Sequence, residues 1–119
     1  MSKVRGIRGA TTVNTNTRRE VIEATQEMLS TILDKNKLSI DDIAAAIFTT
    51  TADINSEFPA YAARMLGWEY IALLDSTQME VHDAIKLCIR VLLLVNTDTP
   101  PNQIKNVYLH EAVNLRKNR

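Results

Sequence analysis

Several residue types on which common catalytic and binding motifs depend are scarce in this chain of 119 residues. Cys88 is the only cysteine, so neither an internal disulfide nor a thiolate metal cluster can form. The only histidines, His82 and His110, lack the spacing of a helical metal-binding pair. Three scattered glycines form no phosphate-binding loop or dinucleotide fingerprint, and no Gly-x-Ser-x-Gly elbow occurs. We therefore expect no metal, no cofactor and no acyl transfer.

Neither sign of charge is in excess, since 14 Lys and Arg residues balance 14 Asp and Glu residues. The charges are spread along the chain, so no basic surface for nucleic acid or anionic lipid is expected. The longest apolar runs are far shorter than a membrane span, and Met1–Gly6 lacks the apolar core of a signal peptide. These features, with the single cysteine, predict a cytoplasmic protein without a nucleic-acid or membrane partner.

Turn residues and apolar periodicity divide the chain into alternating strands and helices. Strands are predicted over 3–13, 44–51, 68–74, 89–95 and 106–110. Helices are predicted over 17–35, briefly from 39, over 56–66 and over 81–87, with a connector or helical turn at 75–79. Thr17 and Glu20 have the spacing of a capping box, and Gly67 follows the third helix. The pattern predicts one domain, residues 1–119, of the α/β or α+β class with a mixed sheet.

The remaining candidates for chemistry are arginines that lie beside apolar residues. Arg90 lies inside the apolar segment Cys88–Asp98, which is predicted to be a buried strand. Its side chain shares a face with Leu92 and Leu94, so it reaches water only if a cavity opens there. An arginine keeps its proton, and burying it alone is costly, so either the protein or a ligand must supply an anion. The others, each explained singly by an apolar stem with a solvated head, are Arg5, Arg8, Arg64 and Arg116.

Six segments follow the pattern of one known family, in the same order and over nearly the whole chain. They are Val4–Val13, Phe58–Ala60 with Arg64, Cys88–Val91, Asn96–Pro100, Val107–Leu109, and Glu111–Val113 with Leu115–Arg116. Together they resemble the trimeric AroH-type chorismate mutases. The resemblance implies α/β subunits that form a homotrimer, a pseudo-α/β-barrel with its active sites in clefts between neighbours. A chain this short is at the small end for enclosing a site alone, which agrees with that assembly.

The reaction that the resemblance implies is the rearrangement of chorismate, a dianion, to prephenate on the route to phenylalanine and tyrosine. This pericyclic step passes no proton to the enzyme and forms no covalent intermediate, which fits a sequence without nucleophile or metal motifs. As the ether C–O bond breaks ahead of C–C bond formation, negative charge grows on the ether oxygen and positive charge on the ring fragment. The forked donors of arginine suit both the carboxylates and that oxygen.

Matched residue by residue, the resemblance implies a role for each candidate. Arg90 would face the ether oxygen and a carboxylate, Arg8 would bind a carboxylate, and Tyr108 would donate a hydrogen bond. Phe58 and Ala60 would line the cleft from the adjoining subunit. The other implied substrate contacts lie in segments that close or order on binding, namely Arg64, Leu115 and Arg116.

The chain departs from the family at position 78, where a glutamate normally meets the ring hydroxyl and the cationic fragment and this chain has Gln78. Asp75 stands three residues earlier, where the family often has Cys or Ser. In a helical turn the two side chains would share a face, and Asp75 would supply the missing carboxylate while Gln78 bonds the hydroxyl. In an extended segment they would face opposite sides, and Asp75 would be a cap or turn residue. Tyr61, near a position where the family can have lysine, predicts a weaker field at the cleft mouth.

Two other classes of function fit parts of the sequence. A trimeric binding module would capture an anionic metabolite in the arginine cleft without chemistry, which fits the missing glutamate. An interaction subunit would pair its arginines with the acids of a partner, but this explains Arg90 poorly. A chorismate-consumption assay separates the enzyme from the binder.

Overall fold

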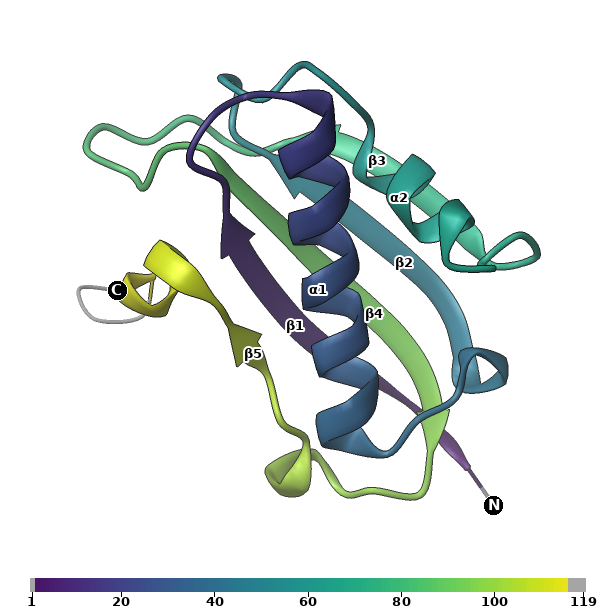
Figure 1. The fold of residues 1–119 in the computed structure, drawn as a ribbon. Coiled ribbons are helices and arrows are strands. Elements are labelled where there is room, and N and C mark those ends of the chain that lie inside the picture. Colours follow the sequence, from purple (N-terminus) through teal and green to yellow (C-terminus); the bar gives the residue numbers. More distant parts are fainter. Residues whose placement is uncertain (1, 116–119) are drawn as a thin grey trace.

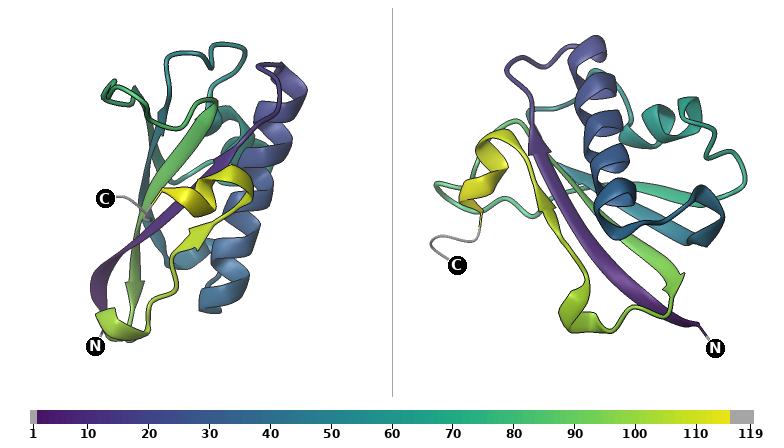
Figure 2. Two further views of the ribbon diagram at one scale, coloured as in Figure 1. Left: turned by 90° about the vertical axis from the view of Figure 1, so that its left-hand side faces the viewer. Right: turned by 60° about the horizontal axis from the view of Figure 1, so that its bottom comes forward.

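The computed structural model describes residues 2–115, which form a five-stranded mixed sheet with two helices on one face (Figure 1, Figure 2). The strands are β1 (Lys3–Thr12), β2 (Ile43–Thr50), β3 (Ala72–Thr77), β4 (Cys88–Thr97) and β5 (Val107–Tyr108). The helices are α1 (Arg18–Asn36) and α2 (Pro59–Met65). Three short 3-10 turns also occur: η1 (Ile40–Asp42) before β2, η2 (Pro101–Gln103) before β5, and η3 (His110–Asn114) after β5. The predicted α+β class with a mixed sheet is confirmed.

β4 occupies the centre of the sheet, whose strand order is β3-β2-β4-β1-β5. It pairs antiparallel with β1 and β2, while β3 and β5 add parallel to β2 and β1 at the two edges. Because side chains alternate along a strand, Ile89, Val91 and Leu93 enter the core on the helix side, whereas Arg90 and Leu92 are exposed on the other face. Arg90 therefore shares a face of β4 with Leu92, as the sequence predicted.

α1 lies across the sheet and contributes the largest helical share of the core. Its start is fixed by Thr17, whose side chain accepts a hydrogen bond from the Glu20 amide at 3.2 Å. The reciprocal half of the predicted capping box does not form, because the Glu20 carboxylate accepts from the Asn14 amide instead. Within residues 2–115, no helix is long and apolar enough to cross a membrane. The fully buried apolar residues of α1 are Val21, Met28, Leu29 and Ile32.

The chain between β2 and β3 differs from the sequence prediction. α2 begins at Pro59 rather than at 56, since proline suits the first helical position, and Phe58 is the cap residue. The predicted strand over 68–74 is wrong at its start, because Trp68 packs into the core from a loop and the strand covers 72–77. The predicted connector or helical turn at 75–79 is likewise wrong over 75–77, which are extended in β3. Short apolar runs do not distinguish these conformations by themselves.

The segment between β3 and β4 is a loop that projects from the sheet (green in Figure 1), so the helix predicted over 81–87 is wrong. Asp83 and Leu87 have φ angles of 62° and 50°, in the left-handed region that a right-handed helix excludes. The Asp53 carboxylate accepts a hydrogen bond from the Leu87 amide at 3.0 Å and so holds the loop at the start of β4. β5 is also shorter than the predicted 106–110, because His110 turns the chain into η3.

The sheet face opposite α1 and α2 is covered by no helix of residues 2–115 (Figure 2). Several large apolar side chains are therefore exposed, including Val4, Leu74 and Leu92, which are 58%, 60% and 38% accessible. Register places Leu74 beside Ile47 and Leu92 beside Arg8, so these side chains belong to one continuous surface. We call it the open face of the sheet.

Candidate active site

A cavity of about 700 Å³ lies on the open face and is lined by β1, β2, β4, β5 and the end of η3. It brings together four of the residues that the sequence singled out, Arg8, Arg90, Tyr108 and Leu115. The cavity exists because the cross-strand neighbours of Arg90 are small: Ala10 on β1 and Thr49 on β2. Its remaining lining is mostly apolar, with Ile47 and Leu92 beside the cations.

Arg90 lines this space without an acidic partner among residues 2–115. Among the described residues, the ion pairs are Arg18–Glu57 and Arg19–Glu23, and two histidines contact acids, His82 with Asp83 and His110 with Glu27. None of these contacts involves Arg8 or Arg90. The neighbouring Cys88 thiol is buried, which raises its pKa, and the charge of Arg90 and its hydrogen bond oppose that shift. In the single chain Arg8 and Arg90 are both exposed, so water can solvate them. The cavity therefore presents two cations that are free to bind an anion from outside residues 2–115.

Backbone hydrogen bonds set the positions of Arg8 and Tyr108. Tyr108 lies opposite Ala10 in the short parallel ladder between β5 and β1. The Arg8 amide donates to the Asn106 side-chain oxygen at 2.8 Å, and the Leu109 amide donates to the Ala10 carbonyl at 2.9 Å. The two side chains reach the same cavity because these bonds fix the stagger of β5 against β1.

A second group of predicted residues lies on and just before α2 and does not line this cavity. Phe58 is 64% exposed at the helix cap, Ala60 is buried in the first turn, and Arg64 is exposed in the last turn. The sequence placed Phe58 and Ala60 on a wall from an adjoining subunit. Within one chain the structure separates that wall from the Arg8 and Arg90 cavity, and their functional roles stay predictions. Arg116 falls outside the described residues.

Asp75 lies in β3 opposite the buried Phe48, on the helix side of the sheet. Its carboxylate accepts a hydrogen bond from the Ala60 amide at 3.0 Å, so within the chain it caps the first turn of α2. The hypothesis that Asp75 replaces the glutamate missing at position 78 required a helical turn, but residues 75–77 are extended in β3. Burial raises the pKa of the Asp75 carboxyl, while the Ala60 hydrogen bond and the charge of Arg64 act in the opposite direction.

Gln78 follows β3, and its amide donates to the Thr50 carbonyl at 2.8 Å. Its side chain lines a different cavity, of about 650 Å³, together with the loop 79–86. The side-chain oxygen of Gln78 is buried without a hydrogen-bond partner among the described residues. A buried amide oxygen without a donor is unfavourable, so a donor that reached it would stabilise the site.

Sequence reasoning missed the charge that lies beside Tyr61. The Arg18 guanidinium stands 5.3 Å from the centre of the Tyr61 ring and pairs with Glu57 at 2.8 Å. Glu57 and Arg18 are 39 positions apart, so no local pattern could indicate the contact. The cavity residues Ile47 and Thr49 were also missed, although the alternation of β2 contained a signal for them.

The fold and this site define an α+β domain with an arginine-containing cavity on an open sheet face. The sequence matches the family described as chorismate mutase type I over residues 4–119. It is 40% identical over 114 residues to chorismate mutase AroH of Bacillus subtilis (strain 168), covering 95% of this chain and 90% of that one. It is 46% identical over 114 residues to chorismate mutase AroH of Thermus thermophilus, covering 95% and 93%.

A solved structure, a chorismate mutase from Clostridium thermocellum, matches the fold with a TM-score of 0.90 at 45% sequence identity. The match covers 92% of this chain and 97% of that one. The chain therefore belongs to the type I chorismate mutase family, and the resemblance found in the sequence is confirmed.

Proposed function

We propose that this protein is a chorismate mutase that converts chorismate to prephenate in phenylalanine and tyrosine biosynthesis. The observation that carries the proposal is the pair of arginines, Arg8 and Arg90, in a cavity to which the described chain supplies no carboxylate within ion-pair distance. A dianionic substrate satisfies both cations. Family membership identifies that dianion as chorismate.

Catalysis in this cavity is orientation combined with a fixed electric field. Arg8 grips one carboxylate with the two forked donors of its guanidinium. Arg90 contacts the second carboxylate and the ether oxygen, which becomes more negative as the C–O bond breaks, so its contact strengthens in the transition state. Tyr108 donates a hydrogen bond from the same wall. The substrate rearranges within itself, so these residues exchange no proton with it.

The complete site requires a second copy of the chain in this proposal. One wall, with Arg8, Arg90 and Tyr108, lies on the open face of the sheet. The other wall, with Phe58 and Arg64, stands apart from it at α2. A homotrimer that packs the open face of each subunit against α2 of the next would bury the exposed apolar side chains and close three sites. We place this trimer in the cytoplasm, in keeping with a free buried thiol.

Asp75, in β3, and Gln78, just after it, enter the same proposal as groups that the neighbouring subunit brings to the substrate. Gln78 accepts a hydrogen bond from the ring hydroxyl through its side-chain oxygen, which has no donor among the described residues. Asp75 contributes only the field of its negative charge, since its carboxylate is already bonded to the Ala60 amide. Turnover by Asp75→Asn and Gln78→Glu tests these roles. Unchanged turnover in Asp75→Asn would show that the charge of Asp75 has no part in catalysis.

The direct test follows the loss of chorismate and the appearance of prephenate against the spontaneous background. Arg90→Lys should lower kcat by about 100- to 1000-fold while retaining part of the binding, because a point charge does not reproduce the planar fork. Arg19→Lys is the matched control, since Arg19 pairs with Glu23 on the surface of α1 and lines no cavity with Arg90. A protein that binds chorismate and yields no prephenate would be the non-catalytic binding module.

The shared site has its own test by subunit complementation. Arg90→Ala and Arg64→Ala change opposite walls, so each homotrimer should be inactive. Random mixing of the two variants should restore about a quarter of the sites, those in which both walls are unmodified. Arg90→Ala mixed with Arg8→Ala changes the same wall in every subunit and should restore no sites. A chain that sediments as a monomer while fully active would refute the assembly.

A further inference from the structure

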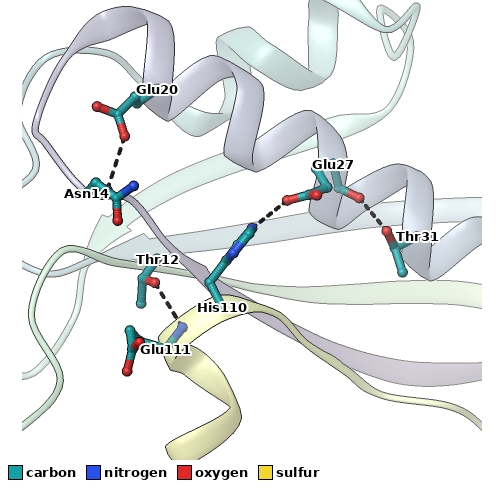
Figure 3. A network of polar contacts seen from close by, with 7 residues as sticks. All are labelled: Thr12, Asn14, Glu20, Glu27, Thr31, His110 and Glu111. Atoms are coloured by element: carbon teal, nitrogen blue, oxygen red, sulfur yellow. Dashed lines mark hydrogen bonds and ion pairs between the residues drawn. The ribbon is translucent and has the colours of Figure 1, made fainter.

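A contact outside the cavity joins its C-terminal wall to α1. The His110 Nε2 atom lies 2.9 Å from a carboxylate oxygen of Glu27, and both side chains are about half exposed. Figure 3 shows the imidazole reaching from the start of η3 towards the helix. His110 lies between Tyr108 and Leu115 in the chain, and both of these line the arginine cavity. The contact between His110 and Glu27 is therefore close in the chain to Tyr108 and Leu115 and can affect their positions in the cavity.

The backbone at His110 needs support from its surroundings. Its φ angle is 53°, in the left-handed region that is unfavourable for a residue with a side chain. This bend turns the chain from β5 into η3. The main chain nearby is held to β1 by a short set of bonds. β5 pairs with β1 through two residues, the Leu109 amide donates to the Ala10 carbonyl at 2.9 Å, and the Glu111 amide donates to the Thr12 hydroxyl at 3.2 Å (Figure 3). A side-chain contact at the bend adds to a sparse set of attachments.

The partner of His110 is specific among the acids of α1. Three glutamates, Glu20, Glu23 and Glu27, line a cleft of about 290 Å³ with His110. Glu20 accepts hydrogen bonds from the loop before α1, and Glu23 pairs with Arg19 at 2.9 Å. Glu27 is the member of this group whose carboxylate is bonded to the imidazole.

We propose that His110 is a positioning residue for the substrate site. Its contact with Glu27 holds the left-handed bend that directs Tyr108 and Leu115 into the cavity, and it touches no substrate itself. This inference rests on the proposed function, because the cavity is taken to bind chorismate. An exposed pair contributes modestly, so the expected change in KM is about two- to fivefold.

The test compares His110→Asn, Glu27→Gln and the double variant. Asparagine tolerates the left-handed conformation but is too short to reach Glu27, so His110→Asn removes the contact and spares the bend. Each single variant should raise KM about two- to fivefold with kcat nearly unchanged, and the double variant should be no worse than the singles. His110→Gln, whose amide nitrogen can still donate to Glu27, should restore most of the loss.

Two further measurements separate positioning from general destabilisation. Glu23→Gln removes a neighbouring negative charge of α1 without touching His110, so KM should not change. Amide hydrogen exchange at Ala112 and Leu115 should accelerate in His110→Asn and Glu27→Gln but not in Glu23→Gln. Additive effects on KM, or faster exchange with an unchanged KM, would overturn the proposal. If the unmodified protein has no mutase activity, the proposed function fails, whereas the exchange comparison still decides whether Glu27 holds the segment.

Discussion

Gly9 marks a close approach between β1 and α1, immediately behind the wall that carries Arg8. A Cβ atom at this position would lie 2.5 Å from Ile32 Cδ1 and 3.1 Å from Val91 Cγ1. Carbon atoms pack at about 3.5–4.0 Å, so Gly9→Ala forces the side chain of Ile32, or α1 itself, to move. Overpacking of this kind destabilises by about 1–3 kcal/mol. The reduced entropy of the unfolded alanine chain offsets about 0.4–1 kcal/mol of that loss.

A second substitution tests whether the clash is the cause. Ile32→Val deletes the Cδ1 atom and keeps Cγ1, which would lie 3.4 Å from the new Cβ, close to ordinary contact. Alone, Ile32→Val should destabilise by about 0.5–1.5 kcal/mol. Combined with Gly9→Ala, Ile32→Val removes the overlap between the new Cβ and Ile32 Cδ1. The free energy of unfolding of the double variant should therefore be at least about 1 kcal/mol higher than the value expected by adding the two single losses.

Urea unfolding followed by circular dichroism measures these free energies, at one fixed protein concentration because association would make stability depend on it. Ile22→Val is the matched control. It shortens another buried isoleucine of α1 that is not among the atoms nearest the new Cβ, so its effect should add to that of Gly9→Ala. Additivity between Gly9→Ala and Ile32→Val, or a Gly9→Ala protein as stable as the original, would refute the steric argument.

Two further predictions concern titratable groups. Burial raises the pKa of Asp75, so the folded protein holds this proton more tightly than the unfolded chain, and stability should fall as pH rises from the ordinary carboxyl pKa through the raised one. Asp75→Asn, which keeps an oxygen for the Ala60 amide, should flatten that part of a urea-midpoint-against-pH curve; an identical curve would contradict the assignment. Cys88 is fully buried with a raised thiol pKa, so alkylation should proceed only as fast as the protein opens. Rapid labelling of the native protein would show that the strand is less protected than its packing indicates.

The division of the candidate residues into two walls follows from the sheet. Alternation along β4 sends Arg90 to the open face, while Asp75 on β3 faces the helices. No rotation of side chains within one chain brings these two groups together across a packed sheet. A second copy supplies the only arrangement in the proposal in which the charge near α2 and the arginines face the same substrate.

The sequence by itself determined what a single segment encodes. The periodicity and cap at Thr17 specified α1, the apolar run specified β4, and the two-residue alternation of β4 placed Arg90 away from Ile89 and Val91. The family resemblance was visible because its motifs are contiguous. These features depend on neighbours in the chain, whose geometry local sterics and hydrogen bonding dictate.

Only the tertiary structure decided which distant residues meet. Strand register joined Arg8 and Tyr108 in one cavity, extended pairing with β2 replaced the predicted turn at Asp75, and packing against α1 brought His110 to Glu27. Each of these contacts links positions far apart in the chain, and the energy that selects it comes from close packing and from the hydrogen-bond stagger of neighbouring strands. No periodicity within one segment contains that information.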